Sequence, residues 1–264
     1  MNTNYYEVTE IAGTEVSQEQ VERMCTRYYW AKNYCIDKDV LEVACGSGQG
    51  LGYLAQFSKS IEGGDYSEEI LKTPKRYYGD RVLIKQFDAH SLPYENSSKD
   101  VIIIFEAIYY LKSFDTFLKE CKRVLRDGGL LLISTANKDL FDFNPSPYTY
   151  NYYGVSELSD ILESNNFISK YFGDVSTKKI SLRQKLFRPI KKIAVKINIV
   201  PKSMIAKKIL KKFVFGSLVI LPYEIKDNMI EYSGPEMIDS KKPDKEFKVI
   251  LCEAKLTKVN NKTS

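Results

Sequence analysis

Short apolar runs alternate with segments of helical spacing between residues 39 and 135. The runs are rich in Val, Ile and Leu, and they predict buried strands at 39–44, 60–65, 82–84, 101–105 and 130–134. The segments between them predict a helix at 51–57, a second with Ser67 as its N-cap, and a third at 114–125 that a turn at 127–129 ends. This alternation is typical of a parallel sheet with helices on both faces.

The pattern becomes looser beyond residue 136. A loop rich in Asn, Pro and Tyr reaches Gly154, and a helix opening at 156–158 and a sixth strand at 167–172 follow it. The apolar run at 247–251 predicts a seventh and last strand. We expect one domain whose parts are an N-terminal helical cap (1–38), a core (39–174), a basic helical insertion (175–223) and a C-terminal strand region completing the sheet (224–264).

Composition and charge place the chain among folded, soluble proteins. With 44% hydrophobic and 28% charged residues over 264 positions, it is neither a disordered chain nor a disulfide-stapled miniprotein. No apolar run approaches the roughly 18 residues of a membrane-spanning helix. The net charge of +5 is uneven: residues 1–174 carry −8, residues 178–223 hold 13 Lys and Arg without an acid, and residues 224–264 are neutral. The basicity therefore belongs to the insertion and needs a local explanation.

Cysteine and histidine usage excludes several classes of site. The five cysteines lack CxxC spacing, so we expect reduced thiols rather than a zinc ribbon or a disulfide framework. The single histidine, His90, excludes a His-rich metal site, and we expect no metal. Residues 1–7 show neither a charged n-region nor an apolar h-region, which favours a cytoplasmic protein.

A glycine-rich turn over residues 42–50 directly follows the first strand of the core and directly precedes a helix. Small residues there let the backbone approach a ligand, and the helix N-terminus offers free N–H groups. The turn fits neither the dinucleotide nor the P-loop fingerprint. Asp65 ends the second strand, where a carboxylate can bind ribose hydroxyls. Asp88 ends the third strand and is placed to accept a hydrogen bond from an adenine amino group.

Five stretches carry a resemblance to a known family. They occur in the family's order and spacing: VLEVACGSGQG at 40–50, GGDYSEEIL at 63–71, DAHSLPY at 88–94, DVIIIFEAIYYL at 100–111 and RVLRDGGLLLIST at 123–135. Over roughly residues 39–170 the chain resembles class I S-adenosylmethionine-dependent methyltransferases of the small-molecule type. The resemblance implies an α/β, Rossmann-like three-layer sandwich with a mostly parallel seven-stranded sheet, and a helical insertion between the sixth and seventh strands. Ala44 departs mildly from the family, which often has glycine there.

The resemblance also implies roles in binding S-adenosyl-L-methionine. Glu42 helps to hold the methionine amino group, Asp65 binds the ribose hydroxyls, and Tyr66 lies against adenine. Asp88 and the Ala89 N–H read the adenine edge. The full set of implied cofactor-binding residues is Glu42, Ala44, Cys45, Gly46, Gly48, Asp65, Tyr66, Asp88, Ala89 and Phe105.

Methyl transfer to a hydroxyl or amine requires the acceptor to lose a proton, which calls for a base in the site. Glu106 and His90 are the catalytic candidates, ahead of Tyr109 and Tyr110. Tyrosines can stack on a sugar or lipid head group, which makes Tyr109, Tyr148 and Tyr153 the substrate candidates. The cluster at 27–30 belongs either to a helix over the cofactor or to aromatic core packing.

The basic insertion shows helical spacing at 182–197, interrupted by Pro189, and again after Pro201. It is either a cap with solvated lysines, or a cap that also contacts an anionic membrane or a diphosphate-linked substrate through residues 178–216. Nucleic acid is a poor partner because the surrounding surface is acidic. The stretches PSPYTYNYYGVSEL, SLRQKLF and VPKSMIAKKILKKFVFG resemble methyltransferases of bacterial polysaccharide or glycolipid biosynthesis.

These observations predict transfer of a methyl group from S-adenosyl-L-methionine to a small-molecule acceptor. The expected acceptor is a hydroxyl, or an amine, of a nucleotide- or lipid-linked sugar in surface glycan biosynthesis. Methylation of a quinone or another lipid is the alternative enzymatic reading. A non-catalytic module that binds S-adenosylmethionine and regulates a partner is the alternative from another class. The sequence predicts no oligomeric state.

Overall fold

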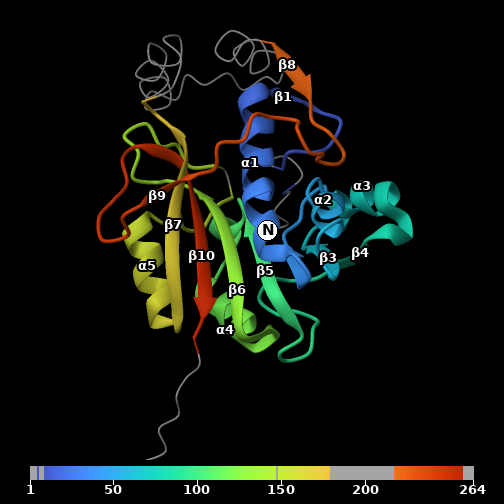
Figure 1. The fold of residues 1–264 in the computed structure, drawn as a ribbon, viewed down its shortest axis with the longest axis horizontal. Coiled ribbons are helices and arrows are strands. Elements are labelled where there is room, and N and C mark those ends of the chain that lie inside the picture. Colours follow the sequence, from blue (N-terminus) through green and yellow to red (C-terminus); the bar gives the residue numbers. More distant parts are fainter. Residues whose placement is uncertain (1–4, 6–8, 147, 179–216, 258–264) are drawn as a thin grey trace, which may run out of the picture.

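The computed structural model describes residues 5, 9–146, 148–178 and 217–257 (Figure 1). Its helices are α1 Gln18–Cys35, α2 Leu51–Ala55, α3 Glu68–Tyr78, α4 Phe114–Val124 and α5 Val155–Ser164. Its strands are β1 Glu15–Ser17, β2 Asp39–Val43, β3 Ser60–Asp65, β4 Leu83–Gln86, β5 Lys99–Phe105, β6 Leu125–Ala136, β7 Phe167–Ser176, β8 Leu218–Ile220, β9 Glu236–Ile238 and β10 Phe247–Leu256. Every strand and helix expected within the described residues is present.

One mixed sheet organises the domain, in the strand order β4-β3-β2-β5-β6-β10-β7-β9. Strands β2 to β6 are parallel, whereas β10 runs antiparallel between β6 and β7. The seven expected strands are joined by β9, which pairs with the outer edge of β7. A separate two-stranded sheet pairs β1 with β8 (Figure 1). Both features escape sequence analysis because each of these strands has only three residues.

Helices cover both faces of the sheet, which confirms the three-layer sandwich. Val40, Val101 and Ile103 pack with α1 and α2 on one face. Leu41 and Ile102, on neighbouring strand positions, pack with α4 and α5 on the other. Neighbouring residues of a strand pack on opposite faces because successive side chains of a strand point to opposite sides of the sheet.

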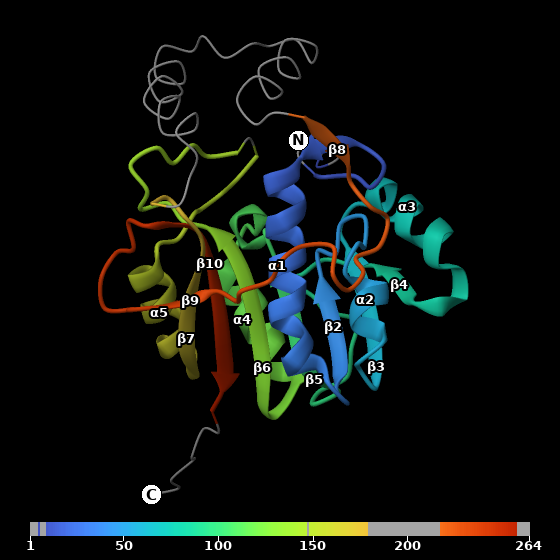
Figure 2. The same ribbon diagram turned by 45° about the horizontal axis from the view of Figure 1, so that its top comes forward.

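The cluster at 27–30 lies within α1, and its aromatic side chains pack in the core, one of the two roles expected for it. Ser17 caps α1 and forms a capping box with Gln20. Tyr28, Tyr29 and Trp30 are buried in the core between α1 and the sheet. The helix runs along one face of the sheet, with its N-terminal part toward the carboxyl ends of the parallel strands (Figure 2).

The connection between α4 and β6 differs from the expected one. The helix ends at Val124 and the strand begins at once at Leu125, so residues 127–129 lie within β6 rather than in a turn before it. Leu125 pairs with Lys99, and the pairing then shifts register between Lys99 and Val101. A bulge of this kind absorbs the glycines without ending the strand.

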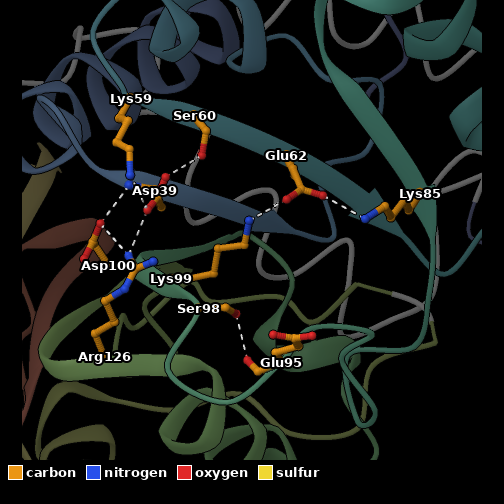
Figure 3. Close-up of polar contacts among 10 residues, drawn as sticks. All are labelled: Asp39, Lys59, Ser60, Glu62, Lys85, Glu95, Ser98, Lys99, Asp100 and Arg126. Atoms are coloured by element: carbon orange, nitrogen blue, oxygen red, sulfur yellow. Dashed lines mark hydrogen bonds and ion pairs between the residues drawn. The ribbon is translucent and has the colours of Figure 1, made fainter.

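A charged network ties together the starts of the parallel strands, at the end of the sheet away from the glycine-rich turn (Figure 3). Arg126 bridges Asp39 and Asp100 at 2.9 Å to each. Ser60 Oγ donates to Asp39 at 2.8 Å. This hydrogen bond, with those of Lys59 and Arg126, lowers the pKa of Asp39 to about 2. Nearby, Lys99 is buried and pairs with Glu62, which also binds Lys85.

The helices expected at 182–197 and after Pro201 lie outside the described residues, which resume at residue 217. Within the described part of the chain, no helix is long and apolar enough to cross a membrane. All five cysteines are buried and free.

Candidate active site

A cavity of about 670 Å³ lies at the carboxyl ends of β2, β3 and β5. Its size suits a nucleoside-sized cofactor together with part of an acceptor. The predicted site residues that line it are Glu42, Ala44, Cys45, Gly46, Asp65, Tyr66, Asp88, Ala89, His90, Phe105, Glu106 and Tyr109. Three predicted residues, Gly48, Tyr148 and Tyr153, do not line it.

The glycine-rich turn adopts left-handed backbone conformations at three positions. Ala44, Gly46 and Gly48 have φ values of 55°, 57° and 77°. A side chain at Gly48 would place its Cβ 2.8 Å from the Pro74 Cβ, so this glycine is required by packing against α3. Ala44 holds a strained conformation where the resembling family often has glycine, and such strain is characteristic of ligand-binding turns.

Asp65 holds the turn in place from the end of β3. Its Oδ2 accepts a hydrogen bond from the Gly46 N–H, and its Oδ1 accepts one from the Ser67 N–H, both at 3.0 Å. Burial raises the pKa of Asp65, and the hydrogen bonds from the backbone oppose that rise. Each carboxylate oxygen has a second lone pair, which leaves capacity for a ligand hydroxyl in the cavity.

Glu42 is a buried carboxylate at the end of β2, with 1% of its surface exposed. The Tyr28 hydroxyl donates to its Oε1, while its Oε2 is buried without a hydrogen-bond partner within the described structure. Burial raises the pKa of Glu42 to about 7. A buried oxygen without a donor is costly, and an ammonium group in the cavity would satisfy it. The site therefore fits a ligand with an amino group beside Glu42.

His90, in the loop that follows β4, connects this loop to the start of α4. Asp88 Oδ1 accepts from the His90 backbone N–H at 2.8 Å and contacts its Nδ1 at 2.6 Å. His90 Nε2 accepts from the Ser113 N–H at 3.2 Å, and Ser113 caps α4. This pattern assigns the proton of neutral His90 to Nδ1 and occupies the nitrogen that a general base would use.

Glu106 follows β5 in a left-handed conformation, with φ of 52°. Its Oε1 accepts from Ser134 Oγ at 2.8 Å and lies 3.9 Å from Arg27 Nη1. Its Oε2 accepts from the Tyr109 hydroxyl at 3.1 Å. Burial, followed by the charge of Glu106, raises the pKa of Tyr109 well above its usual range, so this hydroxyl stays a donor. Three side chains from separate elements thus orient one carboxylate at the cavity wall.

The tyrosine-rich loop contributes a different residue from those expected. Tyr150 lines the cavity, and its N–H donates to the Tyr109 carbonyl at 2.8 Å. Tyr152 stacks on Tyr109 at 4.4 Å, whereas Tyr153 points away and packs on Phe114 at 5.4 Å. Successive side chains of an extended segment point to opposite sides, which separates these neighbours.

Three side chains reach the cavity from α1: Arg23, Arg27 and Tyr28. The sequence placed the cluster at 27–30 near the cofactor as one of two alternatives, but it gave no role to Arg23. A signal was present, because positions 23 and 27 fall on one face of a helix. The face alone did not reveal that it points toward the ligand rather than toward solvent.

The strand order, the turn after the first parallel strand and the carboxylate after the second define a nucleoside-binding α/β domain of the methyltransferase class. Comparison with known families agrees: residues 41–133 match the family described as "Methyltransferase domain". The chain carries a class I S-adenosylmethionine-dependent methyltransferase domain, and the cofactor of this enzyme family is S-adenosyl-L-methionine.

Several individual proteins are similar to this chain. A "Probable S-adenosylmethionine-dependent methyltransferase" of Mycolicibacterium smegmatis is 34% identical over 50% of this chain and 53% of its own length. The "Fatty-acid O-methyltransferase" of the same species is 35% identical over 38% of this chain and 37% of its own length. The chain thus spans about half the length, or less, of these curated relatives.

A solved structure extends the likeness in fold. The phosphoethanolamine N-methyltransferase 2 of Haemonchus contortus, in complex with S-adenosyl-L-methionine, superposes with a TM-score of 0.54. The match covers 91% of this chain and 53% of that one at 15% identity. At that identity the likeness concerns the fold alone.

Proposed function

We propose that this chain is an active methyltransferase that moves the methyl group of S-adenosyl-L-methionine to a hydroxyl oxygen, or an amine, of a small-molecule acceptor. The observation that carries the proposal is the oriented carboxylate of Glu106 in the same cavity as the orphaned oxygen of Glu42. Glu42 Oε2 fits the amino group of the cofactor, and the carboxylate of Glu106 can contact the acceptor.

Binding of the cofactor rests on residues at the carboxyl ends of three strands, β2, β3 and β4. Glu42 Oε2 would hold the methionine ammonium group, and Asp65 would bind the ribose hydroxyls. Asp88 and the Ala89 N–H would meet the adenine edge, with Tyr66 against its face. When bound, the cofactor supplies a methyl group on a positively charged sulfur, which is an activated leaving group. Positioning then provides most of the rate acceleration.

Deprotonation of the acceptor is assigned to Glu106. Ser134 and Tyr109 donate to its two oxygens, and Arg27 lies close to one of them, so the carboxyl group is held in one orientation. Its remaining lone pairs can accept the proton of an acceptor hydroxyl. His90 is the weaker candidate because both of its ring nitrogens already contact protein groups.

A row of aromatic rings runs through the cavity from Tyr66, proposed to lie against adenine, toward the proposed acceptor side at Tyr109. Tyr66, Tyr5 and Tyr110 form edge contacts in series, at 6.3 Å and then 5.7 Å between ring centroids. Tyr110 in turn meets Tyr109 at 4.8 Å. Such rings pack equally well on a sugar or on an acyl chain. We propose a glycan or glycolipid acceptor, and the fatty-acid methyltransferase among the relatives supports a lipid as the alternative.

Substitution of Glu106 tests the proposal. Turnover is measured by mass spectrometry with a pool of acceptors extracted from cells, and cofactor affinity by calorimetry with S-adenosylhomocysteine. Glu106→Gln should lower turnover about 10²-fold or more while affinity for the cofactor product changes less than about threefold. Glu69→Gln, on the exposed side of α3, is the matched control. Unchanged turnover in Glu106→Gln would remove its role, and binding without turnover in the unmodified chain would favour a regulatory module.

We also propose a cytoplasmic protein that contacts the inner membrane face through residues 178–216. The support is the charge of that segment, which contains no acid. Flotation of the full chain with vesicles containing an anionic lipid should exceed flotation with neutral vesicles. Changing the lysines of 202–212 to glutamine should abolish the difference. Equal flotation with both vesicle types would leave the segment as a cap alone.

A further inference from the structure

Two arginine side chains reach the cavity from α1 with unused donors. Arg23 and Arg27 are one helical turn apart, so they share one face of the helix. Both line the cavity. The Nε atom of each is buried and has no hydrogen-bond partner within the described structure. Buried donors are rarely left unpaired in folded proteins, so each of these two needs an explanation.

Nearby carboxylates compensate the charge of these arginines only in part. Glu106 Oε1 is 3.9 Å from Arg27 Nη1, which is beyond hydrogen-bonding distance. Burial raises the pKa of Asp174, at the end of β7, and the charges of Arg23 and Arg27 oppose that rise. Glu10, which also lines the cavity, acts through its charge on Arg27. None of these carboxylates satisfies either Nε donor.

We propose that Arg23 and Arg27 form a subsite for an oxyanion, a carboxylate or a phosphate group, carried by the acceptor. A guanidinium presents a planar pair of N–H donors that matches both groups. The inference rests on the proposed function, because it assigns the anion to the molecule that is methylated.

The subsite adjoins the proposed place of the cofactor, because the charge of Arg27 also acts on Glu42 and opposes the rise in its pKa. Glu42, with its orphaned oxygen, marks the place of the cofactor amino group at the end of β2. Arg27 contacts the other candidate carboxylate, Glu106. Arg23 is one turn nearer the start of α1, which adjoins β1 and therefore β8 (Figure 2). An anion held between the arginines would thus leave a neighbouring hydroxyl of the same molecule facing Glu106.

Three monosaccharide probes test the subsite: glucose 1-phosphate, methyl glucuronide and the neutral methyl glucoside. Their affinities are measured by calorimetry with the full chain saturated with S-adenosylhomocysteine. We expect at least one anionic probe to bind about tenfold or more tightly than the neutral one. Arg23→Gln should remove that preference, whereas Arg76→Gln, an exposed arginine on α3, should keep it. Preference for the phosphate or for the carboxylate identifies which oxyanion the acceptor carries.

Two results would overturn the inference. Equal affinity for the three probes would show that the arginines bind no anion. A loss of S-adenosylhomocysteine affinity in Arg23→Gln, without a change in probe preference, would assign that arginine to the cofactor carboxylate. Arg23→Lys, which keeps the charge, and a thermal melt of each variant separate loss of the subsite from loss of the fold. Failure of the unmodified chain to bind S-adenosylhomocysteine at all would instead overturn the proposed function.

Discussion

Glu42 presents a conflict between folding and cofactor binding that a single substitution can expose. Its carboxylate is buried, with one oxygen bound by Tyr28 and the other without a hydrogen-bond partner among the described residues. Glu42→Gln keeps the shape and can still accept from Tyr28, but it removes the charge. We expect the variant to be more stable and to bind the cofactor less tightly.

The magnitudes follow from the pKa. Burial raises the pKa of Glu42 from 4.5 to about 7. Because the pKa of Glu42 is higher in the folded than in the unfolded protein, ionisation of Glu42 lowers the free energy of unfolding. No stability is lost below pH 4.5, and about 3 kcal/mol is lost as the pH rises through 7. Glu42→Gln removes this loss, but its buried amide lacks a hydrogen-bond partner, which costs about 1–2 kcal/mol. The variant should therefore melt about 3–6 °C higher at pH 8.

Cofactor binding should show the opposite dependence. An ammonium ligand binds the ionised carboxylate, so affinity should fall about tenfold between pH 8 and pH 6 as Glu42 takes up a proton. Loss of the charge-assisted hydrogen bond in Glu42→Gln should weaken binding at pH 8 by about 10- to 100-fold. The variant should also lose the steep pH dependence.

Calorimetry with S-adenosylhomocysteine at pH 6, 7 and 8 provides the assay. The ligand's own amino group titrates identically against both proteins, so the difference between them isolates Glu42. Glu163→Gln, an exposed carboxylate on α5, is the matched control. The reasoning fails if Glu42→Gln binds as tightly as the unmodified protein at pH 8, or if it keeps the same pH dependence.

Four further predictions concern residues around the site and the base of the sheet. Tyr28→Phe leaves the partner carboxylate without its donor, so calorimetry should show about tenfold weaker S-adenosylhomocysteine binding. Gly48→Ala combines a 2.8 Å clash with φ of 77° and should cost roughly 2–4 kcal/mol in urea unfolding. Tyr150→Ala should raise the acceptor KM about fivefold or more with an unchanged Tm, whereas Tyr153→Ala should lower the Tm and leave KM unchanged; the reverse pattern would contradict the placement of the loop. Asp39 has a lowered pKa, so its contribution is present above pH 3.8 and is lost as the pH falls toward 2. Asp39→Asn should therefore lower the Tm at pH 7 and flatten its fall between pH 4 and pH 2.

The parts of the fold that local pattern specifies could be predicted. Strands such as 101–105 are uniform apolar runs, and Ser67 and the following acids mark a helix start that the structure confirms. The turn at 127–129 was misplaced because glycines usually end an element, whereas here a register shift lets the strand continue through them. Periodicity describes one segment at a time and carries no information on pairing across strands.

Contacts between distant segments could not be predicted. The Tyr28–Glu42 hydrogen bond joins a helix and a strand, and the Ser134–Glu106 bond joins β6 to the residue that follows β5. Each depends on where a side chain points once the layers have packed. The tether of His90 to Ser113 likewise needs the loop and α4 to be in place. Candidate residues at strand ends were therefore found, but their partners were not.

The strand order also has a consequence for synthesis of the chain. β7 pairs only with β10 and β9, both of which follow it in the sequence, so within the described sheet it has no neighbour until those residues leave the ribosome. Until then β6 also presents an open edge on the side that β10 will occupy. Open strand edges promote aggregation, so the nascent protein passes through a vulnerable half-sheet that depends on chaperones or on fast translation of its last strand. Truncation before Phe247 should consequently yield insoluble protein although the cofactor-binding strands are intact.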